Sequence, residues 1–245
     1  MTCVTAGGSR AHQDHRVRRN SLPARLTGRP VVAGAAAIGV VAGVLIGWPG
    51  LDTVNGCGLA VNRYPSETAK DWVRYADVVV VGRAVEERES GREELSAGTY
   101  SYEVDRTVQL EVQDKPFTST TRSHPTVGSS LDYIGLGWNV LRSDGKTLIP
   151  ELTGDAPRVV PDHTYVLALR WEDERWVSLG EGAVVPFDGQ SVGNGEWCGQ
   201  VVDTDGFAQG ERTGRRSDHS LEKTLLGQGL PALKSALDAA AKKAS

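Results

Sequence analysis

The chain has 245 residues, of which 39% are hydrophobic and 24% charged, a composition typical of folded proteins and not of disordered ones. Its formal net charge of −4 is uneven, because residues 1–30 carry +5, from six arginines and one aspartate, and the rest of the chain carries −9. An acidic body lacks the clustered lysine and arginine that phosphate contacts need, so we expect no nucleic-acid partner for the main domain.

The apolar segment 31–48 is eighteen residues long and contains no charged side chain. As an α-helix it would span roughly 27 Å, close to the hydrocarbon thickness of a bilayer. All the flanking arginines precede it, which places the N-terminus in the cytoplasm and the rest of the chain outside. The sequence therefore predicts a basic cytoplasmic tail at 1–30, one transmembrane helix at 31–48, a linker at 49–65 and an extracytoplasmic domain at 66–245, in a single-pass protein of the plasma membrane.

Three alternatives to a retained membrane helix remain open. A cleaved signal peptide would have a shorter apolar stretch, and its best cleavage site, Gly58-Leu59-Ala60, lies far downstream. A lipoprotein would use Cys57, but Asn55 fits a lipobox badly. A buried soluble helix would need another long helix to pack against, and the sequence shows no other long helical pattern for it.

Three glycines, Gly39, Gly43 and Gly47, fall on one face of the predicted membrane helix. This doubled G-x-x-x-G pattern lets two membrane helices approach closely, which makes a homodimer through this segment one hypothesis. The simpler interpretation is that small residues are common in membrane helices, and we favour it.

Of the three cysteines, Cys3 falls in the predicted cytoplasmic tail. Cys57 and Cys198 both fall on the outer side, where two cysteines favour a disulfide. A metal site is the alternative, but no C-x-x-C and no nearby histidine supply further ligands. We therefore predict the disulfide Cys57–Cys198, no metal site and no cofactor.

The first part of the outer domain contains one short helix and two strands. Ser66 is expected to cap a helix over 67–75, and the four valines 78–81 predict a buried strand. The charged segment 86–98 is expected to be a loop. Strict alternation of apolar and polar residues over 100–112 predicts a half-buried strand, whose apolar face is interrupted by Arg106.

The second part of the domain ends in a helix. Residues 165–169 form an apolar run that predicts a central strand. Trp171 and Trp176 flank a four-residue loop, 172–175, which predicts a hairpin with two facing indole rings. Leucines at helical spacing after Ser220 predict one amphipathic helix, interrupted near 227–229.

Short strands, many turns and one terminal helix predict a mainly β fold, a small barrel or a sandwich. The segment Ala76-Asp77-Val78-Val79-Val80-Val81-Gly82-Arg83, the alternating strand 100–112 and the run 164–169 together resemble bacterial (actinobacterial-like) cell-envelope ectodomains of uncharacterised function. The resemblance implies an OB-type barrel, similar to the tissue metalloprotease inhibitors, and it brings no active site. The family's usual Lys-Gly pair after the alternating strand is missing, since 114–116 stand there.

The candidate chemical groups are few. The outer histidines are His124, His163 and His219. The pair Asp162-His163 and the many serines allow a Ser-His-Asp site to be drawn. However, the sequence contains no G-x-S-x-G or comparable nucleophile turn. The tryptophans suggest another possibility: if two or more of them cluster on an exposed face, they favour a carbohydrate or protein ligand. They are Trp138, Trp171, Trp176 and Trp197.

From these observations we expect a membrane-anchored extracytoplasmic binding or interaction module, non-enzymatic, with a protein or cell-wall ligand. The alternative is a cell-envelope hydrolase that uses His163 or His124.

Overall fold

The computed structural model describes residues 62–153, 156–197, 200–206 and 219–244. The predicted tail, the predicted membrane helix at 31–48 and both cysteines of the predicted pair, Cys57 and Cys198, lie outside these ranges and stay predictions. Within the ranges, no helix combines the length and the apolar character needed to cross a bilayer.

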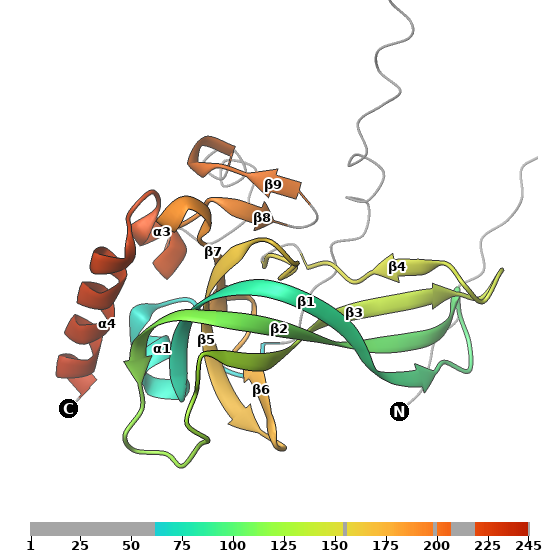
Figure 1. Cartoon of the computed structure of the whole chain (residues 1–245), viewed down its shortest axis with the longest axis horizontal. Helices are drawn as coiled ribbons and strands as arrows, with labels where there is room; N and C mark the ends of the chain where they lie inside the picture. The colour runs from blue at the N-terminus through green and yellow to red at the C-terminus, as the bar shows by residue number, and fades with distance from the viewer. Residues whose placement is uncertain (1–61, 154–155, 198–199, 207–218, 245) are drawn as a thin grey trace, which may run out of the picture. The chain divides into compact units, whose positions relative to one another are not determined.

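The domain is mainly β, as the sequence predicts (Figure 1). A single path of strand pairs runs β1-β2-β3-β6-β5-β7, and because β5 also pairs with β1, five of the strands form a closed ring. In this ring β3 and β6 are parallel and the other pairs antiparallel, while β4 pairs with β3 outside the ring, and β8 with β9 in a separate small sheet. The strands are β1 (Val78–Glu94), β2 (Tyr100–Thr118), β3 (Ser130–Leu141), β4 (Leu148–Pro150), β5 (Thr164–Glu172), β6 (Arg175–Ser178), β7 (Val184–Pro186), β8 (Gly195–Trp197) and β9 (Gln200–Val202).

The four consecutive valines of β1 are all buried because both faces of the strand are covered. Successive side chains of a strand point to opposite faces. Val78 and Val80 therefore join the core inside the ring, and Val79 and Val81 join a second core beneath the helices. The predicted buried strand is confirmed, and its lack of alternation follows from this position between two cores.

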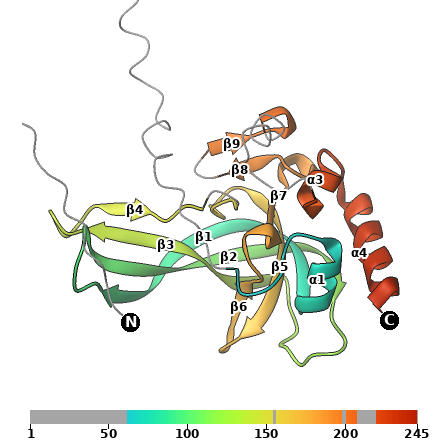
Figure 2. The ribbon, with the colours of Figure 1, turned by 180° about the vertical axis from the view of Figure 1, so that it is seen from behind.

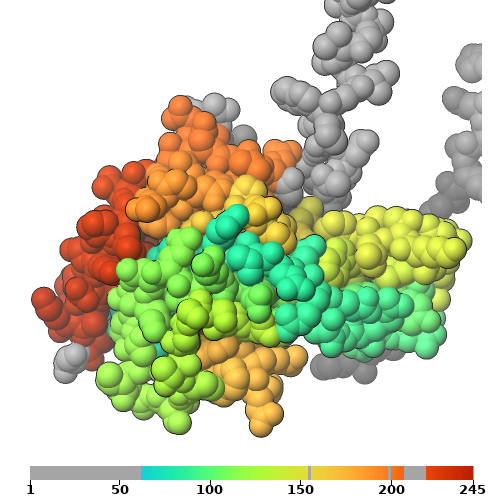
Figure 3. Space-filling view, in the orientation of Figure 1, coloured from blue at the N-terminus to red at the C-terminus, as the bar shows by residue number. Residues whose placement is uncertain are grey.

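The helices cover the second core. α1 (Ala69–Tyr75), α3 (Leu221–Leu225) and α4 (Leu230–Ala244) bring Trp72, Leu221, Leu233 and Leu237 against the outer side of β1 and β5. Figure 2 shows α1 between α4 and the strands, and Figure 3 shows α4 (red) flanking the green end of β2. Short 3-10 turns, η2 (Glu181–Ala183) and η3 (Asp188–Gln190), precede and follow β7.

Three local predictions need correction. The cap of α1 is Thr68 rather than Ser66, because Thr68 and Asp71 form a reciprocal capping box and Ser66 instead accepts the Trp72 indole N–H through its carbonyl. The segment 86–98 is mostly strand, since β1 continues to Glu94 along β2. The β5–β6 loop has two residues, Asp173 and Glu174, whose φ angles of 48° and 62° are those of a type I′ turn.

The break in the C-terminal helix is confirmed. Ser220 caps α3 by accepting from the Lys223 N–H at 3.1 Å. The chain then turns at Gly227, whose φ of 74° favours glycine, before α4 begins.

Candidate functional site

Two hollows lie beside β3, and the first contains the predicted tryptophan pair. Trp171 and Trp176 face each other across β5 and β6, with ring centroids 5.1 Å apart and an edge-to-face angle of 61°. They border a cavity of about 570 Å³, which we call the tryptophan groove. Its other walls come from β1, β2, β3, the segment before β3, the β5–β6 turn and the start of β6. The residues are Arg88, Thr107, Gln109, Thr126, Val127, Ser130, Leu131, Asp132, Ile134, Glu174 and Arg175.

The two indole rings have different roles in the groove. Trp176 is 5% exposed and belongs to the core inside the ring, and the centroid of its ring lies 5.8 Å from that of the His124 ring, edge to face. Trp171 is only partly buried against the same core, so part of its ring is open to solvent. A rigid aromatic face with polar neighbours suits the apolar faces of sugar rings or a peptide side chain.

Asp77 and Arg122 fix the position of one groove wall. The Asp77 carboxylate is 3% exposed; it accepts from Arg122 Nε at 2.5 Å and from the Trp171 backbone N–H at 2.9 Å. Arg122 also donates to the carbonyls of Arg74 and Ala76. This partly buried ion pair therefore ties the segment that carries His124 and Val127 to the start of β1 and to the tryptophan hairpin.

The charges that line the groove are balanced. Arg88 forms an ion pair with Asp132, and this hydrogen bond raises the pKa of the Arg88 guanidinium. Glu174 and Arg175 add one charge of each sign at the hairpin. A groove with no net charge does not favour a polyanion such as nucleic acid.

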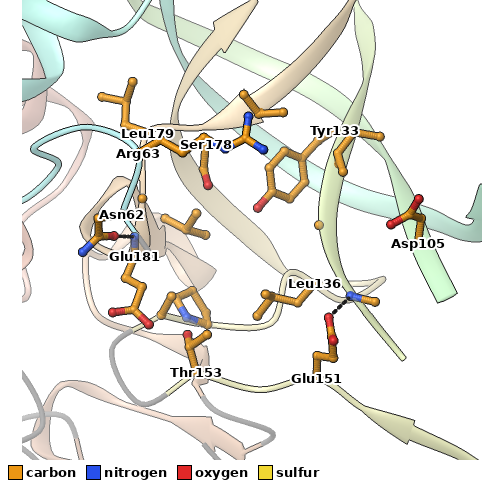
Figure 4. A pocket seen from close by; sticks show the side chains of 18 of the residues that line it. Asn62, Arg63, Asp105, Tyr133, Leu136, Glu151, Thr153, Ser178, Leu179 and Glu181 are labelled. Carbon is orange, nitrogen blue, oxygen red and sulfur yellow. Dashed lines mark hydrogen bonds between the residues drawn. The ribbon is translucent and has the colours of Figure 1, made fainter. Parts of the chain in front are cut away.

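The second hollow lies where β3 changes its partner strand (Figure 4). β3 pairs with β6 at Tyr133 and Ile134 and with β4 from Trp138 onward, so the stretch 135–137 has no strand on that side. The cavity beside it measures about 260 Å³, and we call it the acidic pocket. Its acidic side chains are Glu103 and Asp105 of β2, Glu151 after β4 and Glu181 of η2; Arg63 is the basic one.

Glycine is required at the back of the acidic pocket. A Cβ atom on Gly137 would lie 1.9 Å from the Val104 carbonyl oxygen, so β2 and β3 could not come this close with any other residue. The pairing of β2 and β3 shifts register between Val104 and Arg106 at the same place. This β-bulge bends the strand and leaves the hollow beside it.

The bulge also explains Arg106, which interrupts the alternating pattern of β2. Its side chain is fully buried and pairs with Glu87 at 2.6 Å, while a second buried arginine, Arg158, donates Nη1 to the carbonyls of Leu136, Gly137 and Glu151. Both guanidinium groups lie over the Trp138 ring, 5.6 and 5.1 Å from its centroid. The pKa of Arg158 is lowered to about 10, chiefly by burial and secondly by the positive charge of the nearby Arg106. The two arginines thus make a charged core behind the pocket wall.

The histidines of the hydrolase alternative have structural contacts. His163 Nδ1 lies 2.5 Å from Asp188 Oδ2, and the other oxygen of Asp188 accepts from the Thr164 N–H at 2.7 Å, which ties η3 to the start of β5. The His124 ring packs on Trp176 and hydrogen-bonds to the Pro125 and Ser119 carbonyls. In the described ranges no hydrogen bond joins either ring to a serine hydroxyl, and no group of three His, Cys, Asp or Glu side chains suits a metal ion.

Two further residues that the sequence analysis named, Trp197 and His219, are not among the contacts of His124 and His163 described above. Trp197 packs with Leu152, Val202 and Leu226 in a small separate cluster, and His219 is exposed before α3. Within the described part of the chain, two of the four tryptophans, Trp171 and Trp176, are in ring contact with each other.

The sequence analysis missed Asp188, Glu103 and Glu151. Asp188 follows Phe187 in an irregular segment, and Glu103 is one polar residue of a regular alternation. The single available signal was Arg106, since a charged residue on an apolar face needs a buried acid or a bulge nearby.

No protein-family model matches the chain, and a search of curated proteins found no significant match.

Proposed function

We propose that this chain is a membrane-anchored extracytoplasmic binding module, non-enzymatic, and that its ligand site is the tryptophan groove. The anchor is the predicted helix at 31–48, and the predicted setting is the cell envelope. The observation that carries the proposal is the partly buried Trp171, in ring contact with the buried Trp176, at the border of a groove with polar lining on the ring of strands.

The order of the strands supports the position of this site. We infer an OB-type barrel, and the ring order β1-β2-β3-β6-β5, closed by β5 on β1 and with one parallel pair, supports this inference. In OB-type barrels the face of the second and third strands, together with the loop between the fourth and fifth, binds oligosaccharides or oligonucleotides. Here that face is formed by β2 and β3, and the loop is the β5–β6 turn beside Trp171.

The chemistry of the groove favours an oligosaccharide among these ligands. The balanced charges of the groove do not attract a nucleic acid. Hydroxyl, amide and charged side chains next to an indole face match the alternating polar edges and apolar faces of a sugar chain. We infer that the ligand is an uncharged segment of a cell-wall glycan.

Calorimetric titration of the full chain in mild detergent with a tetramer of β-1,4-linked N-acetylglucosamine tests this proposal. We expect binding that Trp171→Ala weakens about two- to tenfold, because aromatic contacts contribute about 0.5–1.5 kcal/mol. Tyr102→Ala provides the matched control. It removes a partly buried aromatic ring from β2, outside the groove, and should leave binding unchanged. Absence of glycan binding, or equal effects of the two variants, would contradict the proposal. If the wild-type chain instead captures a protein and the Trp171→Ala variant does not, the ligand of the groove is a protein.

The alternative, a cell-envelope hydrolase, has one supporting observation, the short contact between His163 and Asp188. Such a pair can orient a histidine as a general base. The hydrolase would show activity on ester, amide or glycan substrates that is lost in His163→Ala and retained in His219→Ala. A His163→Ala variant with lower stability and no lost activity would leave the pair a purely structural contact.

A further inference from the structure

The acidic pocket contains more negative charge than its own residues neutralise. Arg63 at its rim lies 3.3 Å from Glu172, an acid that is not part of the pocket. Among the described residues, the donors to Glu151 are neutral: the Gly137 N–H at 3.1 Å and the Asn139 amide at 3.2 Å. The pKa of the Glu103 carboxyl is raised. The charge of Glu151 is the largest cause, and burial and the other acids nearby add to it. Carboxylates held this close together favour a cation between them.

The buried arginines behind the wall do not line the cavity, and their side chains are committed to other groups. Arg106 is paired with Glu87 on the far side of β2. Arg158 directs its Nη1 to three backbone carbonyl oxygens, and the charges of Glu87, Glu196 and, least of the three, Glu151 raise its pKa against the effect of burial. Both side chains are buried, and neither is among the residues that line the cavity.

A second observation, independent of the acids, comes from Thr153. This residue lines the acidic pocket and is 6% exposed, and its hydroxyl oxygen has no hydrogen-bond partner in the structure. Figure 4 shows the Thr153 side chain turned toward the cavity, between Glu181 and Glu151 in that view. A buried hydroxyl is costly without a partner, so its position indicates a bound group that hydrogen-bonds to it.

The rest of the lining limits the kind of cation. Leu136, Val177 and Leu179 give the pocket apolar walls, and a volume of about 260 Å³ accommodates an aliphatic chain of a few carbons. An ammonium group has three donors and no acceptor, which suits two carboxylates and one hydroxyl. We propose that the acidic pocket binds a primary ammonium group carried on an aliphatic stem, as in a lysine side chain or a free diamine.

In this arrangement the stem lies along Leu136 and Leu179, and the ammonium donates to Glu151, Glu103 and Thr153. Burial of the methylene groups and the charge-assisted hydrogen bonds then contribute together. The site is separate from the tryptophan groove, so the two sites can be tested independently.

The experiment is a calorimetric or NMR titration of the full chain in mild detergent with three probes. These are Nα-acetyl-lysine methylamide, 1,5-diaminopentane and the neutral isostere Nα-acetyl-norleucine methylamide. We expect both amines to bind and the norleucine compound to bind at least about tenfold more weakly, because it lacks the charge-assisted hydrogen bonds. Preference for the lysine derivative indicates a peptide side chain as the source of the ammonium; preference for the diamine indicates a free polyamine.

Two variants locate the site. Glu151→Gln keeps an oxygen for the Gly137 N–H but removes the charge, and it should weaken amine binding about tenfold; Thr153→Val removes only the hydroxyl and should weaken it about threefold. Glu111→Gln, on the same strand as Glu103 but outside both hollows, is the control and should bind as the wild type does. Trp171→Ala should also leave amine binding unchanged.

Failure of both amines to bind at about 10 mM would overturn the proposal. So would equal binding of the norleucine compound, or amine binding that survives both pocket substitutions. Because Thr153→Val is nearly isosteric, it tests the site even if Glu151→Gln lowers the stability of the chain.

Discussion

The tryptophan groove and the acidic pocket are both built on β2, β3 and β6, but they arise from opposite features of these strands. The groove lies where the strands pair in regular register and side chains alternate, so that Trp171 and Trp176 face each other. The pocket lies where the register shifts at Val104, where two glycines replace side chains and where β3 changes partner. Regular pairing thus forms a surface of aromatic side chains, whereas a bulge forms a hollow that collects charge.

The two hollows also differ in what holds them in place. The groove depends on a long-range ion pair between Asp77 and Arg122, and the pocket depends on backbone contact at Gly137. If this comparison is correct, a substitution at either position should disturb one hollow far more than the other.

The largest effect is expected for Asp77→Ala. This change removes the buried carboxylate of a partly buried ion pair, leaves Arg122 without its carboxylate and frees the Trp171 N–H, so we expect a loss of about 3 kcal/mol in unfolding free energy. Urea unfolding of the full chain measures it. Asp162→Ala, which breaks the exposed ion pair with Arg83, is the control and should cost less than about 1 kcal/mol. Equal losses in the two variants would show that Asp77 does not hold the groove wall.

A smaller effect, confined to the other hollow, is expected for Gly137→Ala. The new methyl group would overlap the Val104 carbonyl, so β2 and β3 must separate, at a cost of about 1–3 kcal/mol. Gly128→Ala is the control, because its Cβ would meet nothing within 4 Å, and it should change stability by at most about 0.5 kcal/mol. Glycan binding at the groove should stay unchanged in Gly137→Ala; a large change in that binding would mean that the two hollows are coupled.

The same contrast decides how much the sequence alone could predict. Alternation over 100–112 and the spacing of Trp171 and Trp176 depend on local strand geometry, and the structure confirms the strand and the facing indoles. The break in the C-terminal helix also follows from local signals, the glycines at 227 and 229. These features were predictable because the period of a strand or a helix is fixed by the backbone.

The acidic pocket could not be predicted in this way. Glu103, Glu151 and Thr153 are far apart in the sequence and meet only because β2 bulges beside the end of β4. The extension of β1 to Glu94 was missed for a related reason: its charged residues are stabilised by pairing with β2 and not by burial, so composition alone indicated a loop. Tertiary pairing overrides local propensity at such positions.

The smallest effect, and the sharpest test of the charge in the pocket, is expected for Glu103→Gln. The folded-state pKa of Glu103 is raised, chiefly by Glu151, so between the ordinary value of 4.5 and that higher value the folded chain binds more protons than the unfolded chain. Stability from this group therefore falls as pH rises through that window, and the carboxylate is a slight cost at neutral pH. Removing it should raise the unfolding free energy at pH 7, by at most about 0.5 kcal/mol because solvent screens this exposed group, and the gain should vanish well below pH 4.5. Glu111→Gln should show no such pH-dependent gain. If Glu103→Gln lowers stability at neutral pH instead, the carboxylates do not repel one another, and the pocket differs from the groove in shape alone.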